Sequence, residues 1–228
     1  MRDRWRITIT CTGAAYPSVL VVEHQPRRPG DVGRSPTQLT MGTREYEYVG
    51  PIEFCDAAKS QPSGTRIVSR ADLLTWLAYT QTDRSPDGTN IATFTIDVDG
   101  ELLLAPRRSE HVACASGGPV LSAGEISFDD ELTVTEISNQ STGFCPEPES
   151  WATVATALDR IGIPHPGRFT TEVVFRLCPS CNERNIVKDD WYYCTMCDRK
   201  LPRSWNFSRN ENVGEQSDAR ERRSRADS

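Results

Sequence analysis

The sequence predicts an α+β fold, in which a mainly antiparallel β domain with two or three helices precedes a small cysteine-rich hairpin. Three observations support this prediction. Short apolar runs are separated by turn signals, two segments repeat apolar residues at helical spacing, and two C-x-x-C pairs stand near the C-terminus. With 228 residues, the chain is long enough for one sizeable core and one small satellite.

The first domain is expected to cover residues 1–65 and to contain short strands. Apolar and polar residues alternate over residues 5–11, and a second apolar run follows at residues 18–22. Residues 25–43 are rich in Pro, Gly, Ser, Thr and Arg, and such a composition buries too little apolar surface to order itself. We therefore expect a mobile loop there, followed by a short strand at residues 45–49.

The central domain is expected to cover residues 66–170 and to be rich in β structure. Asp99-Gly100 stands between two apolar runs, and this dipeptide is a strong short-range signal for a β-hairpin, here over residues 91–105. A further strand is expected at residues 132–139, where apolar and polar residues alternate.

Two helices are expected in the same domain. Ser69 is followed three residues later by Asp72, a spacing that predicts a capped helix N-terminus, and the apolar stripe behind it extends to about Tyr79. Ser150 is expected to cap a second helix over residues 151–160, which also carries apolar residues on one stripe.

Two C-x-x-C pairs separated by twelve residues form the most specific motif of the chain, and their members are Cys178, Cys181, Cys194 and Cys197. Each pair can fold into a tight knuckle whose two sulfurs lie about 2.3 Å from one tetrahedral Zn²⁺ ion. Because four cysteines fill the tetrahedron, we predict one structural zinc ion and no open catalytic position. Two disulfides, or a thioredoxin-type redox pair, are the alternatives.

The cysteines define a predicted zinc ribbon over residues 171–205. A strand over residues 169–177 is expected to run directly into the first pair, and residues 191–193 are expected to form a strand that packs its aromatic side chains on the neighbouring domain. A segment of about 30 residues buries too small a core of its own, so metal binding would supply much of its folding free energy. Residues 206–228 are polar without periodicity, which predicts a disordered tail.

Composition and charge argue against several classes of protein. The net charge of −6 and the pI near 5.2 do not suit a chain built to wrap nucleic acid. No apolar run approaches the roughly 20 residues of a membrane span, and the first residues do not resemble a signal peptide. The remaining cysteines show no disulfide-framework spacing: Cys11, Cys55, Cys114 and Cys145. We therefore expect a cytoplasmic protein without membrane contact.

Three short motifs in residues 91–162 carry a family resemblance. A His-x-x-x-x-x-Gly segment is matched by His111 and Gly117, and a Val-x-x-Ala-Gly element by Val120, Ala123 and Gly124. A Ser-Gly-His-Tyr-x-Pro signature is matched by Ser141 and Pro146, with Phe144 as an aromatic residue in place of the tyrosine. In these motifs the chain resembles the β-rich domain of plant IQ-motif (IQM) calmodulin-binding proteins and of related bacterial and fungal proteins. It departs from the signature at Thr142 and at Gly143, where the family has its central histidine. No IQ motif is present, so calmodulin binding is not implied.

The same region contains the candidate catalytic residues. His111 could act as a general base, and Ser141 or Cys145 could be a nucleophile if the fold brought it within hydrogen-bond reach of the histidine. The structural alternative is a histidine that packs beneath a Gly-rich turn and bonds a backbone carbonyl.

Charge also bears on the function expected of the ribbon. Residues 99–150 contain ten acidic and two basic side chains, a net of −8, which would repel a polyanion. Nucleic-acid binding by the ribbon is therefore disfavoured, although aromatic side chains at residues 191–193 could stack on a single strand. The sequence favours a zinc-stabilised protein-interaction or regulatory module, an accessory protein whose gene lies in an operon with that of its partner. The alternatives are an enzyme and a nucleic-acid-binding ribbon.

Overall fold

The computed structural model describes residues 44–60, 64–80 and 88–207. The strands expected at residues 5–11 and 18–22, the loop at residues 25–43 and most of the expected tail lie outside these ranges. Within them, no helix is long and apolar enough to cross a bilayer.

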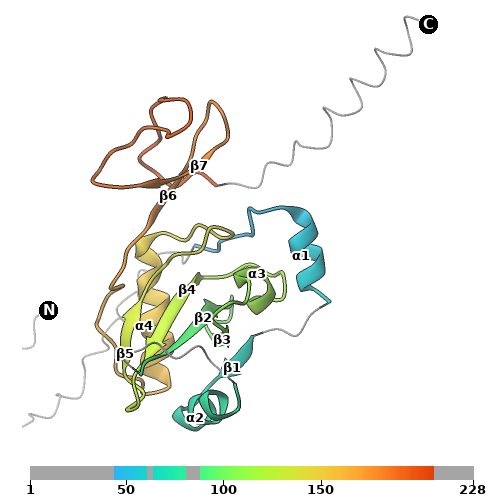
Figure 1. Ribbon diagram of the computed structural model, residues 1–228, viewed down its shortest axis with the longest axis vertical. Helices are drawn as coiled ribbons and strands as arrows, with labels where there is room; N and C mark the ends of the chain where they lie inside the picture. Colours follow the sequence, from blue (N-terminus) through green and yellow to red (C-terminus); the bar gives the residue numbers. More distant parts are fainter. Residues whose placement is uncertain (1–43, 61–63, 81–87, 208–228) are drawn as a thin grey trace, which may run out of the picture. The chain divides into compact units, whose positions relative to one another are not determined.

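Five strands form an antiparallel sheet with the order β1-β3-β2-β4-β5 (Figure 1). The strands are β1 (Thr65–Ile67), β2 (Asn90–Ile96), β3 (Leu102–Pro106), β4 (Ser122–Phe128) and β5 (Val134–Ile137). The predicted hairpin joins β2 to β3, because Ile96 pairs with Leu102 and Gly100 adopts a φ of +78° between them. With the helices described below, this sheet confirms the predicted α+β class.

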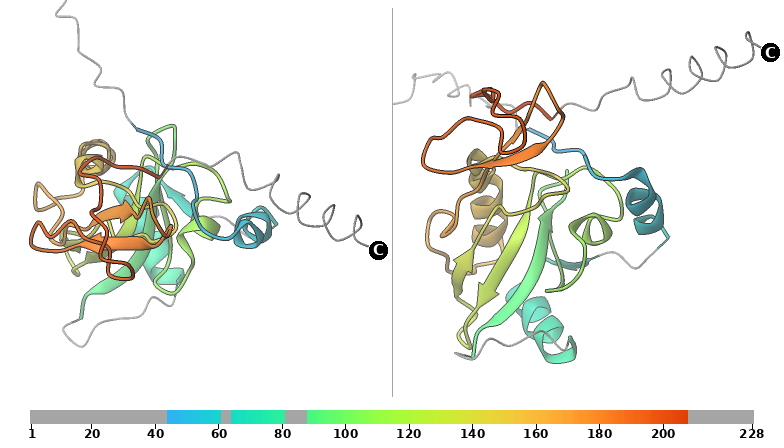
Figure 2. Two further views of the ribbon diagram at one scale, coloured as in Figure 1. Left: turned by 90° about the horizontal axis from the view of Figure 1, so that it is seen from above. Right: turned by 45° about the horizontal axis from the view of Figure 1, so that its top comes forward.

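Successive side chains of β2 point to opposite faces of the sheet, and both faces are covered by helices. Ala92, Phe94 and Ile96 are fully buried in the main core, which also contains buried side chains of α2 (Arg70–Tyr79) and α4 (Trp151–Arg160). Thr93 and Thr95 point to the opposite face. There the Thr95 hydroxyl donates a hydrogen bond to the Cys114 sulfur of α3 (His111–Cys114), which packs with α1 (Ile52–Ala58) in a second apolar cluster. Figure 2 shows α4 on one side of the sheet and α1 and α3 on the other.

The side-chain cap predicted for α2 is formed, whereas the one predicted for α4 is not. At α2, the Asp72 N–H donates to the Ser69 hydroxyl oxygen at 3.2 Å, and that hydroxyl donates to the Asp72 carboxylate at 2.9 Å, so the predicted cap is confirmed. Ser150 occupies the predicted N-cap position of α4 at the end of the 3-10 turn η1 (Pro148–Ser150), but its side chain makes no capping bond, because its hydroxyl bonds the buried Ser122 hydroxyl at 3.0 Å. The short helices α1 and α3 were not predicted.

A second, two-stranded antiparallel sheet follows α4 and consists of β6 (Val174–Leu177) and β7 (Arg184–Val187). We call residues 174–207 the cysteine module. The first C-x-x-C pair lies at the turn between these strands, since Leu177 pairs with Arg184. The strands expected at residues 45–49 and 191–193 are reduced to single bridges, Tyr46 with Val120 and Tyr193 with Lys200.

Candidate metal centre

The first C-x-x-C pair folds into a tight knuckle at the end of β6. The Cys178 N–H donates to the Glu183 carbonyl at 2.8 Å, and the Asn182 N–H donates to the Cys178 carbonyl at 2.9 Å. Asn182, the residue after Cys181, has a φ of +59°. Asn and Asp enter this left-handed region more readily than other residues with a side chain, so the local sequence itself favours the knuckle.

The second pair repeats this backbone pattern. The Cys194 N–H donates to the Arg199 carbonyl at 2.8 Å, and the Asp198 N–H donates to the Cys194 carbonyl at 3.0 Å. Asp198 follows Cys197 and has a φ of +56°. The two knuckles are therefore local copies of one another, and each presents two sulfurs to the same point.

The four sulfurs are positioned to hold one metal ion. All four Sγ atoms lie within 4.8 Å of one another, and both Cys178–Cys197 and Cys181–Cys194 are separated by 3.6 Å. Four sulfurs at about 2.3 Å from a tetrahedral ion would be separated by about 3.8 Å, so the observed spacing fits such an ion.

Hydrogen bonds around Cys194 favour its thiolate form. Burial acts to raise the pKa of Cys194, but hydrogen bonds from the backbone N–H groups of Met196 and Cys197, from the Cys181 thiol and from the Asn185 side chain outweigh it and lower the pKa to about 6. Asn185 also accepts a bond from the Thr195 N–H at 2.9 Å, which holds the second knuckle against β7. The thiolate is the form that binds metal, so these donors prepare the site for a cation.

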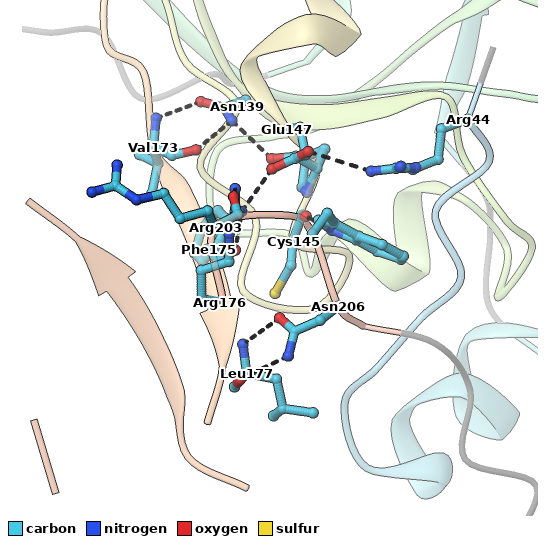
Figure 3. Close-up of polar contacts among 12 residues, drawn as sticks. Arg44, Asn139, Cys145, Glu147, Val173, Phe175, Arg176, Leu177, Arg203 and Asn206 are labelled. Atoms are coloured by element: carbon cyan, nitrogen blue, oxygen red, sulfur yellow. Dashed lines mark hydrogen bonds and ion pairs between the residues drawn. The ribbon is translucent and has the colours of Figure 1, made fainter. Parts of the chain in front are cut away.

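Arg176 of β6 joins the cysteine module to the central sheet domain (Figure 3). Its guanidinium is buried and forms an ion pair with Glu147 at 2.6 Å, and it donates to the backbone carbonyls of Phe175 and Arg203, each at 2.6 Å. Glu147 also pairs with Arg44 at 3.3 Å on the exposed side. One carboxylate thus joins three segments that are far apart in the sequence.

Asn139 fastens the strand that enters the module. It is fully buried, its amide donates to the carbonyls of Pro146 and Val173 at 2.8 and 2.7 Å, and its oxygen accepts the Val173 N–H at 2.7 Å. All three bonds are drawn in Figure 3. The Asn139 side chain therefore bonds both backbone groups of Val173, as the backbone of a neighbouring strand would in a sheet.

The last residues of the cysteine module pack against its first strand, β6. The Leu177 N–H donates to the Asn206 side-chain oxygen at 3.0 Å, and the Asn206 amide donates to the Leu177 carbonyl at 2.8 Å. Trp205 donates from its ring nitrogen to the Cys145 carbonyl at 2.8 Å, and Phe207 is buried against Phe175. Asn206 and Phe207, which were assigned to the tail, are thus packed residues.

Large apolar side chains remain exposed on the module. Trp191 is 68% and Met196 71% exposed, while Tyr193 and Ile186 are 42% and 41% exposed. The Trp191 and Tyr193 rings contact each other at a centroid distance of 4.7 Å. The expectation that these aromatic side chains pack on the neighbouring domain is therefore wrong. Of residues 191–193, only Tyr192 packs within the module, where it contacts Arg203 and the apolar cluster around Leu201.

The structure does not assemble His111 and Ser141 into a catalytic pair. His111 Nε2 and the Ser141 hydroxyl are both buried without a hydrogen-bond partner among the described residues, so they are not bonded to each other. Burial lowers the pKa of His111, which keeps the ring neutral near pH 7. The ring shares a hydrogen bond with the Gly124 backbone, the arrangement expected of the structural alternative.

Cys145 is poorly suited to act as a nucleophile. Burial raises its pKa to about 12, so the sulfur is a thiol near pH 7, and this thiol donates to the Thr142 carbonyl at 3.4 Å. Thiolate is the reactive form of cysteine, and among the described residues neither a histidine nor another base is hydrogen-bonded to this sulfur.

Comparisons with known proteins add no assignment. No family model, curated protein or solved structure matches the chain. The resemblance of residues 91–162 to the IQM domain therefore has no support from relatives, and it stays a prediction.

Proposed function

We propose that this chain is a zinc-stabilised protein-interaction module, whose protein partner docks on the exposed apolar side chains of the cysteine module. One observation carries the proposal. Trp191, Tyr193 and Met196 are large, apolar and exposed on the segment whose shape the four cysteines fix. Exposed aromatic and methionine side chains on a rigid support are typical of protein-binding surfaces, where tryptophan often contributes most of the affinity.

Zinc is the metal that the donor set favours. Four sulfur ligands in a tetrahedron suit zinc or iron, and they leave no open position for a substrate. The ion would act structurally, holding together two knuckles that share only a small apolar cluster of their own.

Charge favours a protein over a nucleic acid as the partner. Between Cys178 and Trp205 the chain has five basic and four acidic side chains, and four thiolates with one Zn²⁺ add −2, leaving −1. The net of −8 over residues 99–150 lies in the domain to which the module is fastened. A polyanion would gain little from this surface, whereas an apolar protein surface would gain from burying Trp191.

A reducing compartment fits the thiol chemistry, and we place the protein in the cytoplasm. All seven cysteines of the described residues are free, and the quartet must stay reduced to bind metal. An accessory protein encoded in the same operon as its partner remains our proposal for the biological setting.

The metal is tested by elemental analysis of the whole chain purified under reducing conditions. We expect one zinc per chain. Chelation should increase amide hydrogen exchange across residues 174–207 while β2 and β4 stay protected, because the central sheet has its own core. Iron in place of zinc would change the metal assignment, and a chain free of metal with an ordered module would remove it.

The partner is tested with a matched pair of variants. Binding to the products of neighbouring genes is measured for the native chain, for Trp191→Ser and for Tyr79→Ser, which alters an aromatic side chain that is 86% exposed on α2. Trp191→Ser should weaken binding about 30-fold or more, as for an interface hot spot, with the zinc content unchanged. Tyr79→Ser should bind normally. Equal binding by all three chains, or binding to oligonucleotides that falls steeply with salt, would overturn the proposal.

A further inference from the structure

A small pocket opens beside α3, where the central domain meets β7 of the cysteine module. Its volume is about 160 Å³, and its lining includes Tyr48, Phe54, Glu110, His111 and Arg184. These residues come from four separate segments, so no sequence motif predicts the pocket. Only His111 among them was a candidate from the sequence.

Tyr48 is fixed in the pocket wall by residues that lack a side chain. A Cβ atom on Gly50 would lie 2.3 Å from the tyrosine hydroxyl oxygen, and one on Gly143 would lie 2.6 Å from its ring. The ring also contacts Phe144 edge-on at a centroid distance of 5.7 Å. Glycine at both positions is therefore what allows the tyrosine to stand there.

The pocket lining contains one acidic and one basic side chain that do not form an ion pair with each other. Glu110 and Arg184 are both exposed, and no ion pair joins them among the described residues. The Arg184 guanidinium is oriented by one hydrogen bond, which it donates to the Thr142 carbonyl at 2.8 Å, so most of its donors stay available. Both charges act on Tyr48: after burial, the Glu110 carboxylate is the next cause that raises the tyrosine pKa, and Arg184 opposes it.

His111 forms part of the pocket wall beside Glu110. Because Nε2 has no partner, Nδ1 makes the hydrogen bond with the Gly124 backbone. A neutral ring that donates from Nδ1 carries a lone pair on Nε2. This Nε2 atom is closed to solvent, so the ring belongs to the wall of the pocket and is not a contact for the ligand.

The pocket volume sets the size of the ligand. A cavity of roughly 150 Å³ accommodates one benzene ring, so 160 Å³ suits a molecule of about six to ten non-hydrogen atoms. A carboxylate acceptor suits an ammonium group, and a guanidinium suits a carboxylate. The aromatic wall suits an apolar side chain and the ammonium cation.

We propose that this pocket binds a free α-amino acid, with the carboxylate of the ligand on Arg184 and its ammonium group on Glu110. The net of −8 over residues 99–150 further favours the ammonium end of such a ligand. This function is independent of the protein-docking surface around Trp191.

The test is a titration of the zinc-loaded whole chain with each free L-amino acid, followed by NMR chemical shifts and by thermal unfolding. At least one amino acid of up to about ten non-hydrogen atoms should saturate the signals of residues 110–112 and 142–143. For L-valine, isovalerate and isobutylamine are matched controls that each lack one of the two charges. Each should bind at least about ten-fold more weakly, because it loses one charge-assisted contact.

Two variants test which residues bind the carboxylate and the ammonium group of the ligand. Glu110→Gln and Arg184→Gln should each weaken binding about ten-fold or more, and both side chains are exposed, so folding is preserved. Arg107→Gln, an exposed arginine outside the pocket lining, should bind normally. The proposal fails if no amino acid shifts these signals at 10 mM, if the single-charge controls bind equally well, or if both pocket variants keep native affinity.

Discussion

Replacing Arg176 by methionine should strongly destabilise the chain, whereas the same change at Arg44 should not. Both arginines pair with Glu147, so the two variants remove the same type of residue from the same carboxylate. The Arg176 side chain is 6% exposed and pairs at 2.6 Å, while the Arg44 side chain is 48% exposed and pairs at 3.3 Å. The two variants therefore compare a buried guanidinium that also bonds two backbone carbonyls with an exposed one that lies over the Trp205 ring.

The magnitude follows from what each variant leaves behind. Without Arg176, the carbonyls of Phe175 and Arg203 lose their bonds to the guanidinium, and Glu147 keeps only the exposed Arg44. Breaking a buried ion pair from one side costs about 3–5 kcal/mol, and we expect about 3 kcal/mol here because Glu147 retains one partner. Arg44→Met should cost no more than about 1 kcal/mol, as is usual for exposed pairs.

Urea unfolding followed by far-UV circular dichroism, with zinc present, measures both free energies. For a chain of this size, a loss of about 3 kcal/mol should lower the midpoint of thermal unfolding by roughly 6–12 °C. Replacing Glu147 by methionine as well should recover part of the loss, since no buried charge is then left unpaired. Equal, small effects of the two single variants would refute the view that the buried guanidinium fastens the module.

Two further predictions concern buried side chains of the central domain. Asn139→Ala should lower the free energy of unfolding by about 3 kcal/mol or more, because three buried backbone groups on Pro146 and Val173 lose their partner; an unchanged urea midpoint would contradict this. His111→Gln should change the pH dependence of stability, because the folded pKa of His111 lies below its ordinary value of 6.5. The neutral ring stabilises the fold above pH 6.5, and this contribution is lost as pH falls from 6.5 towards the lower folded pKa. The difference in unfolding free energy between the native chain and His111→Gln, measured from pH 7.5 to 5, should therefore shrink on acidification; a constant difference would argue against a neutral buried ring.

Features that depend on neighbours in the sequence were predictable. Asp99-Gly100 makes its turn within a few residues, and Ser69 caps its helix through a residue three positions on. The cysteine quartet was also predictable, because each knuckle closes through its own backbone. Local chemistry is readable from one sequence for this reason.

Features that depend on distant partners were not predictable. Ser150 has the residue type and position of a helix cap, but its hydroxyl bonds Ser122, 28 residues earlier. Arg176 looked like one more polar residue in a strand, and its partner Glu147 is 29 residues away. Trp191 was expected inside because aromatic side chains usually are, and only the tertiary structure places it outside.

The paired bonds between Leu177 and Asn206 mean that the chain enters and leaves the cysteine module at one place. Residues 178–205 therefore form an insertion whose two ends are already within hydrogen-bond distance. A short Gly-rich bridge, or a foreign hairpin of similar width, could join these ends provided that the Arg203 carbonyl and the Trp205 ring, which bond Arg176 and the Cys145 carbonyl, are kept. Any shortened version of the protein has to extend to Phe207. Stopping at Trp205 would remove both the Asn206 side chain that bonds Leu177 and the buried Phe207 ring.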